Sequence, residues 1–261
     1  MRGLYPVNTG LLCCGDQFHL IRRAILSGDV IALTAPRCAI LSSLLASERG
    51  HGVASLETRA SRGEEDTVTQ PQSADAMRLL RDGNARYAGG WPTHPHQSRE
   101  RRLEIASAQQ PFAAVLGCSD SRVPPEILFD QGLGDLFVVR TAGHVVDHVV
   151  LGSLEYAVLH LKVSLVVVLG HTRCGAVAAA VEGGEHHGHL GHLVEAIRPA
   201  VEAAREKPGY LVDRAVRENV VRVVAELKNS RPILASLVAN EALSIVGAVY
   251  NLETGRVEFL G

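Results

Sequence analysis

Apolar residues follow two different periods through the longer, C-terminal part of the chain. Short unbroken apolar runs lie at 112–117, 136–140 and 165–169, and such runs are typical of strands buried on both faces. Between the last two runs, apolar side chains recur at helical spacing, at Leu151, Leu154, Val158 and Leu161. The order strand, helix, strand predicts that neighbouring strands of the sheet are parallel.

Helical patterns surround these runs on both sides. Before them, one helix is expected from an N-cap at Ser73 to Gly89-Gly90, and a second from Ser98 to Gln109. After them, helices are expected from Gly175, over 190–207, over 211–228 and through Leu237, followed by a terminal strand at 243–250 and a hairpin to 256–260. The sequence therefore predicts a single α/β domain with a central, mainly parallel β-sheet flanked by helices, preceded by an N-terminal helical arm.

The beginning of the chain has a different character. Residues 1–72 scatter Gly, Ser, Thr and charged residues without a period, which predicts a poorly ordered extension ahead of a folded domain at 73–261. The apolar stretch 30–46 within it is interrupted by Pro36-Arg37-Cys38 and is too short to span a bilayer. We therefore expect no membrane partner.

Composition narrows the functional classes further. A hydrophobic content of 46 % is enough for a buried core, and 26 basic against 28 acidic residues leave no basic stripe for nucleic acid or anionic lipid. The five cysteines are odd in number and irregularly spaced, unlike a secreted disulfide framework. A reducing, cytoplasmic location is expected.

Two short motifs carry the chemistry. Cys118-Ser-Asp120-Ser-Arg122 and His171-Thr-Arg-Cys174-Gly175 each follow a predicted strand, and ligand sites in open α/β sheets lie at the carboxyl ends of strands. A free cysteine is often only a buried core residue. Two thiolates and an imidazole, however, are ligands that zinc accepts while keeping a fourth position open. We expect Cys118, His171 and Cys174 to bind Zn²⁺.

Asp120 and Arg122 have more than one interpretation. They could form an ordinary exposed ion pair, which contributes little to stability. Next to a zinc ligand, the carboxylate of Asp120 could instead take the fourth zinc position, or accept a hydrogen bond from a zinc-bound water while Arg122 holds it. Both roles stay open at this point.

Together these motifs resemble the β-class carbonic anhydrases, and the chain is similar to the bacterial members. The resemblance covers roughly residues 75–260 and extends to four further stretches, at Phe129–Phe137, Arg140–Gly143, Glu155–Ala157 and Gly170-His171. It implies zinc ligands at Cys118, His171 and Cys174, and a catalytic dyad of Asp120 and Arg122.

The same resemblance implies a substrate pocket and an assembly. Gln109, Phe137 and Tyr156 match the pocket of the plant-type members, and the Gly175 amide would lie beside the metal. Val115 stands where the other subtype has a tryptophan of its inhibitory bicarbonate site. The implied assembly is a homodimer or dimer of dimers, with the site at the subunit interface. The implied reaction is reversible hydration of carbon dioxide to bicarbonate and a proton by a zinc-bound hydroxide.

Three other functions compete with this interpretation. A cysteine phosphatase needs five residues between its cysteine and arginine, whereas three separate Cys118 from Arg122. A non-catalytic structural zinc protein, or a zinc hydrolase acting on carbon disulfide-like substrates, remains an alternative. The run Glu185-His-His-Gly-His-Leu-Gly-His192 looks like a second metal site, but its glycines favour a flexible loop.

Overall fold

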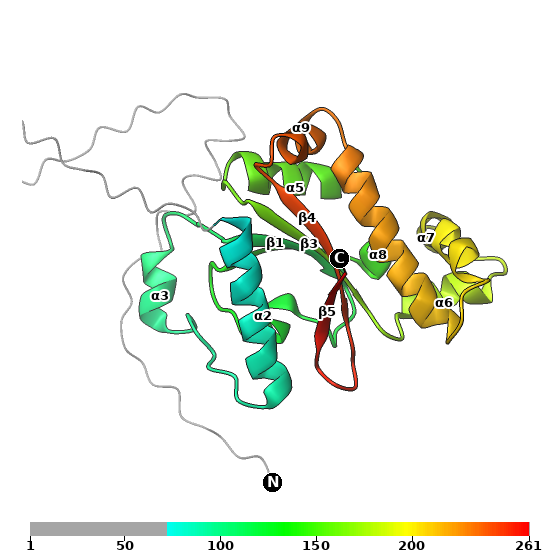
Figure 1. Cartoon of the computed structure of the whole chain (residues 1–261), viewed down its shortest axis with the longest axis horizontal. Helices are drawn as coiled ribbons and strands as arrows, with labels where there is room; N and C mark the ends of the chain where they lie inside the picture. Colours follow the sequence, from blue (N-terminus) through cyan, green and yellow to red (C-terminus); the bar gives the residue numbers. More distant parts are fainter. Residues whose placement is uncertain (1–71, 261) are drawn as a thin grey trace, which may run out of the picture. The chain divides into compact units, whose positions relative to one another are not determined.

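A computed structural model describes residues 72–260, so almost all of the predicted N-terminal extension lies outside the described part. A five-stranded sheet forms its centre (Figure 1), in the order β2-β1-β3-β4-β5. The strands are β1 Ala113–Cys118, β2 Leu136–Thr141, β3 Leu165–His171, β4 Ser244–Tyr250 and β5 Val257–Leu260. Four of them are parallel and β5 is antiparallel to β4. The predicted α/β fold with a mainly parallel sheet is confirmed.

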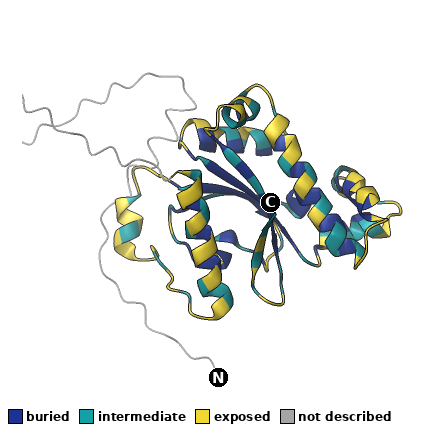
Figure 2. Cartoon of the chain, viewed as in Figure 1, coloured by how far each residue is buried: buried dark blue, intermediate teal, exposed yellow. Residues whose placement is uncertain are grey.

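Helices flank the strands. They are α2 Ser73–Gly89, α3 Arg99–Glu104, α4 Pro125–Leu128, α5 His148–Leu159, α6 Gly175–Glu182, α7 Leu190–Ala204, α8 Leu211–Asn229 and α9 Ile233–Ala239, with a 3-10 turn η1 at Ala142–His144. Figure 1 shows α2 and α8 on opposite sides of the strands; α8 packs on β3 and β4, and α7 packs on α8. The strands β1 and β3 are buried along their whole length (Figure 2). Among the described residues, no helix is both long and apolar enough to cross a membrane.

Three predictions about these elements were wrong in detail. The strand β2 is only partly buried at every position, because it is the edge of the sheet and pairs with β1 alone. The helix expected over Ser98–Gln109 keeps its Ser98 cap but ends at Glu104, and none of its residues is buried. Without a packed apolar face a short helix gains little stability. Helix α2 begins one residue earlier than expected, at Ser73, with Gln72 instead of Ser73 as its N-cap.

Helix α8 approaches the sheet closely because two strand positions are glycine. A Cβ atom on Gly170 would lie 2.6 Å from Val220 Cγ2, and one on Gly247 would lie 2.7 Å from Val220 Cγ1. Any larger residue at either position would push α8 outward. Gly170 directly precedes His171, so this contact also fixes where β3 ends relative to α8.

A buried carboxylate ties the arm to the domain. Asp130 accepts hydrogen bonds from the Arg86 side chain of α2 and from the backbone amides of Thr93 and His94. Burial alone would raise the pKa of this carboxyl, but these donors outweigh it and lower the pKa to about 2. Asp130 is therefore charged in the folded protein and links α2 to the loop that follows it.

Candidate metal centre

Sheet topology brings the two motifs together. Cys118 is the last residue of β1 and His171 the last of β3, and these strands are neighbouring and parallel, with Gly117 paired to Leu169. Cys174 follows three residues after His171 as the N-cap of α6. The prediction that both motifs lie at the carboxyl ends of strands is confirmed.

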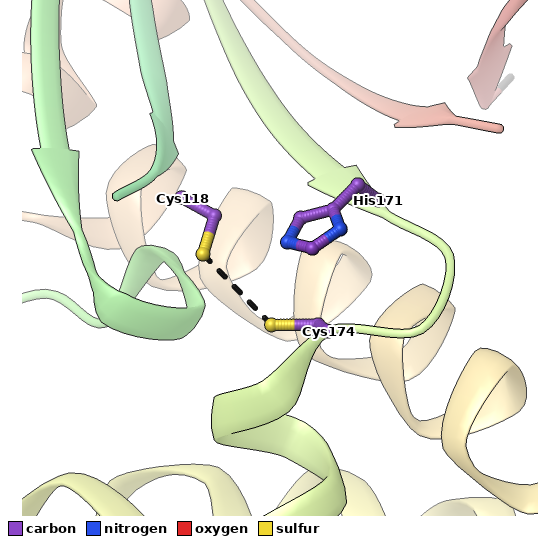
Figure 3. A group of neighbouring side chains, drawn as sticks. All are labelled: Cys118, His171 and Cys174. Carbon is purple, nitrogen blue, oxygen red and sulfur yellow. Dashed lines mark hydrogen bonds between the residues drawn. The ribbon is translucent and has the colours of Figure 1, made fainter. Parts of the chain in front are cut away.

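The three candidate ligand atoms converge on one point. Cys118 Sγ, Cys174 Sγ and one nitrogen of His171 lie within 4.8 Å of one another, and all three residues are buried (Figure 3). The two sulfurs are 3.9 Å apart. A tetrahedral zinc with Zn–S bonds of about 2.3 Å would place two sulfurs about 3.8 Å apart. The spacing of the thiols therefore fits a zinc ion without rearrangement.

The His171 ring is oriented as a ligand. Its Nδ1 bonds the carbonyl oxygen of Thr172 at 2.9 Å, and because a carbonyl can only accept, Nδ1 carries the proton. Nε2 consequently carries a free lone pair, and it is buried without a hydrogen-bond partner in the described part of the chain. A buried polar atom without a partner is costly, and a metal ion is the partner that this atom and the two sulfurs could share.

The thiols are electrostatically unequal. The Cys174 thiol, the His171 ring and the backbone amides of Asp120 and Gly143 lower the pKa of Cys118 against the effect of burial. The neighbouring Cys118 sulfur, together with burial, raises the pKa of Cys174. Without a metal the two neighbouring sulfurs therefore share a proton. A divalent cation would displace that proton, because thiolates and not thiols bind metals.

Asp120 is held by Arg122 on the rim of this centre. Its two carboxylate oxygens accept hydrogen bonds from Arg122 Nε at 2.9 Å and Nη2 at 2.7 Å, and Oδ1 also accepts from the Arg122 backbone amide. These bonds hold the pKa of the Asp120 carboxyl well below its usual range. Oδ2 lies 3.8 Å from His171 Nε2. The carboxylate thus borders the cluster while being bound by the guanidinium.

Arg140 and Gly143 were assigned no role from the sequence, yet both contact the motif. Arg140 donates to the carbonyl oxygens of Cys118 at 2.8 Å and Asp120 at 2.6 Å, which pins the loop that carries them. The Gly143 amide donates to Cys118 Sγ at 3.3 Å. The signal available in the sequence was the strand β2, whose parallel pairing with β1 brings Arg140 beside Gly117.

The predicted pocket residues are distributed over two places. The rings of Phe137 and Tyr156 lie 6.2 Å apart, and Tyr156 is 46 % exposed. Gln109 is exposed and lines a hollow beside His160, whose ring is 5.1 Å from that of Tyr156. Gly175 is the first residue of α6, next to Cys174. Contact of these residues with substrate stays a prediction.

The histidine-rich segment behaves differently from the main cluster. The rings of His189 and His192 lie 6.4 Å apart. Within residues 72–260, the set Cys118, His171 and Cys174 is the group whose ligand atoms come close enough together to hold a metal. The second metal site considered from the sequence is therefore not preassembled in this structure.

Comparison with known proteins decides the family. Residues 113–257 match the family model described as carbonic anhydrase. The chain is 49 % identical over 187 residues to a carbonic anhydrase of Mycolicibacterium smegmatis, covering 70 % of this chain and 91 % of that protein. This chain belongs to the β-class carbonic anhydrase family.

Two further relatives agree with this membership. Carbonic anhydrase 2 of Mycobacterium tuberculosis is 46 % identical over 185 residues, covering 69 % of this chain and 89 % of its own length. The tetrameric β-carbonic anhydrases of the filamentous ascomycete Sordaria macrospora have a solved structure with a TM-score of 0.55 at 27 % identity, covering 72 % of this chain and 98 % of theirs. The resemblance inferred from the two motifs is confirmed, and the shared region includes all three candidate ligands.

Proposed function

We propose that this protein catalyses the reversible hydration of carbon dioxide to bicarbonate and a proton, using zinc held by Cys118, His171 and Cys174. The observation that carries the proposal is the convergence of two sulfurs and one unpartnered imidazole nitrogen within 4.8 Å, at the carboxyl ends of β1 and β3 and inside the region 113–257 that the family model matches. When bound with one open position, zinc lowers the pKa of water to near neutrality and so supplies a nucleophile for carbon dioxide. Family membership favours this reaction over a purely structural zinc site.

Asp120 is proposed to accept the proton of the attacking water, and Arg122 is proposed to orient the Asp120 carboxylate. Arg122 binds both oxygens of the carboxylate, and Oδ2 lies 3.8 Å from His171 Nε2, which supports the proposal that Arg122 holds the carboxylate away from the fourth zinc position. A charged carboxylate beside that position accepts a hydrogen bond and fixes the direction of the attacking oxygen. The alternative role, with Asp120 as a fourth zinc ligand that closes the site, requires release from Arg122.

The substrate pocket is proposed to be completed by a second chain. Carbon dioxide is uncharged, so an apolar wall with few donors is sufficient to hold it. Phe137, Tyr156 and Gln109 are proposed as that wall, with the Gly175 amide beside the metal. Tyr156 and Gln109 are exposed here, as expected of residues that a partner covers. We propose a homodimer or dimer of dimers; the Sordaria macrospora relatives are described as tetrameric.

Domain limits and location follow as further proposals. We assign the activity to residues 73–261 and treat residues 1–72 as an extension of it. The two ligand cysteines are free thiols, and a disulfide between them would abolish metal binding. A reducing compartment, the cytoplasm, therefore suits the protein.

Stopped-flow measurement of carbon dioxide hydration tests the proposal, with zinc analysis of every sample. Cys174→Ser should lose most of its zinc and its turnover, because a serine hydroxyl is a much poorer zinc ligand than a thiolate. Cys38→Ser, the same chemical change outside the residues of the family match, should leave both unchanged. Equal hydration rates in wild type and Cys174→Ser would exclude this site as the catalyst. Full zinc content without hydration would instead assign a structural role.

A further inference from the structure

An unusual turn supplies the Gly143 amide to Cys118. Gly143 and His144 are consecutive residues with positive φ, +63° and +47° respectively. A residue other than glycine rarely adopts this conformation and keeps it only where surrounding contacts enforce it. The product of the turn is the 3.3 Å contact from the Gly143 N–H to Cys118 Sγ. The contacts that hold the turn therefore also hold this bond.

Asn219 of α8 is the residue that bonds both strained positions. Its Nδ2 lies 3.0 Å from the Gly143 carbonyl oxygen and 3.0 Å from His144 Nε2, and its side chain is buried. Because a carbonyl can only accept, the Asn219 amide must present its NH₂ group to Gly143. The second hydrogen of that group then donates to His144 Nε2, which leaves the His144 proton on Nδ1. One amide thus satisfies an acceptor on each of the two positive-φ residues.

Packing leaves the turn little alternative. A Cβ atom on Gly143 would lie 2.7 Å from Ile197 Cδ1 and 3.3 Å from Ala176 Cβ, so α7 and α6 close around it. His144 is fully buried. The turn therefore packs against α6 and α7, and Asn219 bonds it to α8.

We propose that Asn219 is a positioning residue for the metal centre: it clamps the Gly143–His144 turn so that the Gly143 amide donates to the Cys118 sulfur. The inference rests on the proposed function, in which Cys118 is a metal ligand. An N–H···S bond draws electron density from the thiolate, which weakens its donation and leaves the metal more electrophilic. Asn219 touches neither substrate nor metal and acts through the turn alone.

Asn84 provides a matched comparison. It is also buried, its Nδ2 donates to the carbonyls of Leu128 at 3.0 Å and Gly255 at 2.9 Å, and it joins a helix to distant main chain. Its acceptors belong to neither metal motif. A purely structural role for Asn219 predicts that Asn219→Leu and Asn84→Leu behave alike, with losses of stability only. A positioning role predicts a change at Cys118 in the first variant and none in the second.

Cadmium-113 NMR of the full chain separates these outcomes. In ¹⁵N-labelled wild type loaded with ¹¹³Cd²⁺, we expect a scalar coupling between the metal and the Gly143 amide proton, transmitted through Cys118 Sγ, and slow exchange of that proton. Asn219→Leu should lose the coupling, and Asn84→Leu should keep it. With Co²⁺ in place of cadmium, the sulfur-to-metal charge-transfer band should shift in Asn219→Leu alone. Turnover of the zinc form should fall about tenfold in Asn219→Leu, since outer contacts of metal ligands commonly contribute 10–100-fold.

A second variant guards against misfolding. Asn219→Asp keeps the shape of the side chain and, at a pH where the carboxyl is ionised, removes both donors, so it should also lose the coupling. Retention of the coupling in either folded Asn219 variant, or its absence from cadmium-loaded wild type, would overturn the inference while leaving the proposed function intact. Failure of wild type to bind cadmium through Cys118 would overturn the proposed function and the inference with it.

Discussion

Replacing Asp120 by asparagine removes one charge at the rim of the metal centre and little else. The asparagine Oδ1 can still accept from the Arg122 backbone amide and Nε, as Asp120 Oδ1 does at 2.9 Å for both. Its NH₂ group would face the guanidinium Nη2, which now donates to Oδ2 at 2.7 Å. Two donors cannot bond each other, so the amide loses one of the two side-chain bonds and cannot act as a proton acceptor.

The size of the effect should differ between stability and activity. The Arg122 side chain is 54 % exposed and that of Asp120 is 15 % exposed, so water screens the pair from the arginine side and its contribution to folding is small. The free energy of unfolding should therefore change little. Loss of a positioned proton acceptor typically lowers turnover 10²–10⁴-fold. We expect Asp120→Asn to fall in that range, with zinc content close to that of wild type because all three proposed ligands are untouched.

Stopped-flow hydration assays, zinc analysis and denaturant unfolding should be run on the same preparations. Glu202→Gln is the matched control, because Glu202 also binds one arginine through both oxygens, Arg205, at 2.8 and 3.2 Å on an exposed helix face. This control should retain full turnover. Wild-type turnover in Asp120→Asn would refute the proton-acceptor role. Loss of zinc from Asp120→Asn would instead show that the carboxylate is mainly a metal ligand.

Three further outcomes are expected. Asp130→Asn should lower the free energy of unfolding at neutral pH by about 2 kcal/mol, because the pKa of Asp130 falls from 3.8 to about 2 in the folded protein. The charged form of Asp130 stabilises the wild-type fold above about pH 4, and this contribution is lost as the pH falls toward 2. Denaturant unfolding at pH 7 and pH 3 checks it, and an equal wild-type-to-variant gap at both would contradict it. Gly83→Ala would place a Cβ 1.8 Å from the Phe129 carbonyl oxygen and should lower the free energy of unfolding by about 3 kcal/mol. Gly152→Ala, where the added Cβ would meet open space, should not destabilise the fold. Equal melting temperatures of the two variants would refute the packing argument. Zinc removal by a chelator should lower the melting temperature and abolish hydration, and Zn²⁺ but not Mg²⁺ should restore both, since Mg²⁺ prefers oxygen ligands; recovery with Mg²⁺ would argue against a thiolate site.

The central strands and the ligand set could be predicted because their causes are local. The runs that form β1 and β3 are apolar without interruption, and only burial on both faces satisfies such a run. Each ends at a motif residue, Cys118 or His171, so parallel pairing alone brings the ligands together. The error at β2 has the same origin: its apolar run resembles that of a central strand, and the edge position depends on which strand lacks a second neighbour.

The outer contacts of the site depend instead on how α8 crosses the sheet, which no local pattern encodes. Asn219 lies 76 residues from Gly143 along the chain, and its neighbours in α8 show only an amphipathic helix. What places it is the close approach of α8 that Gly170 and Gly247 allow through Val220, the residue that follows Asn219. Asn219 is buried beside Val220, which packs on these strand glycines, and it therefore reaches the segment at the end of the strands. That segment is the Gly143–His144 turn, whose Gly143 amide donates to Cys118. The two glycines that allow the close approach of α8 therefore also set the position of this amide.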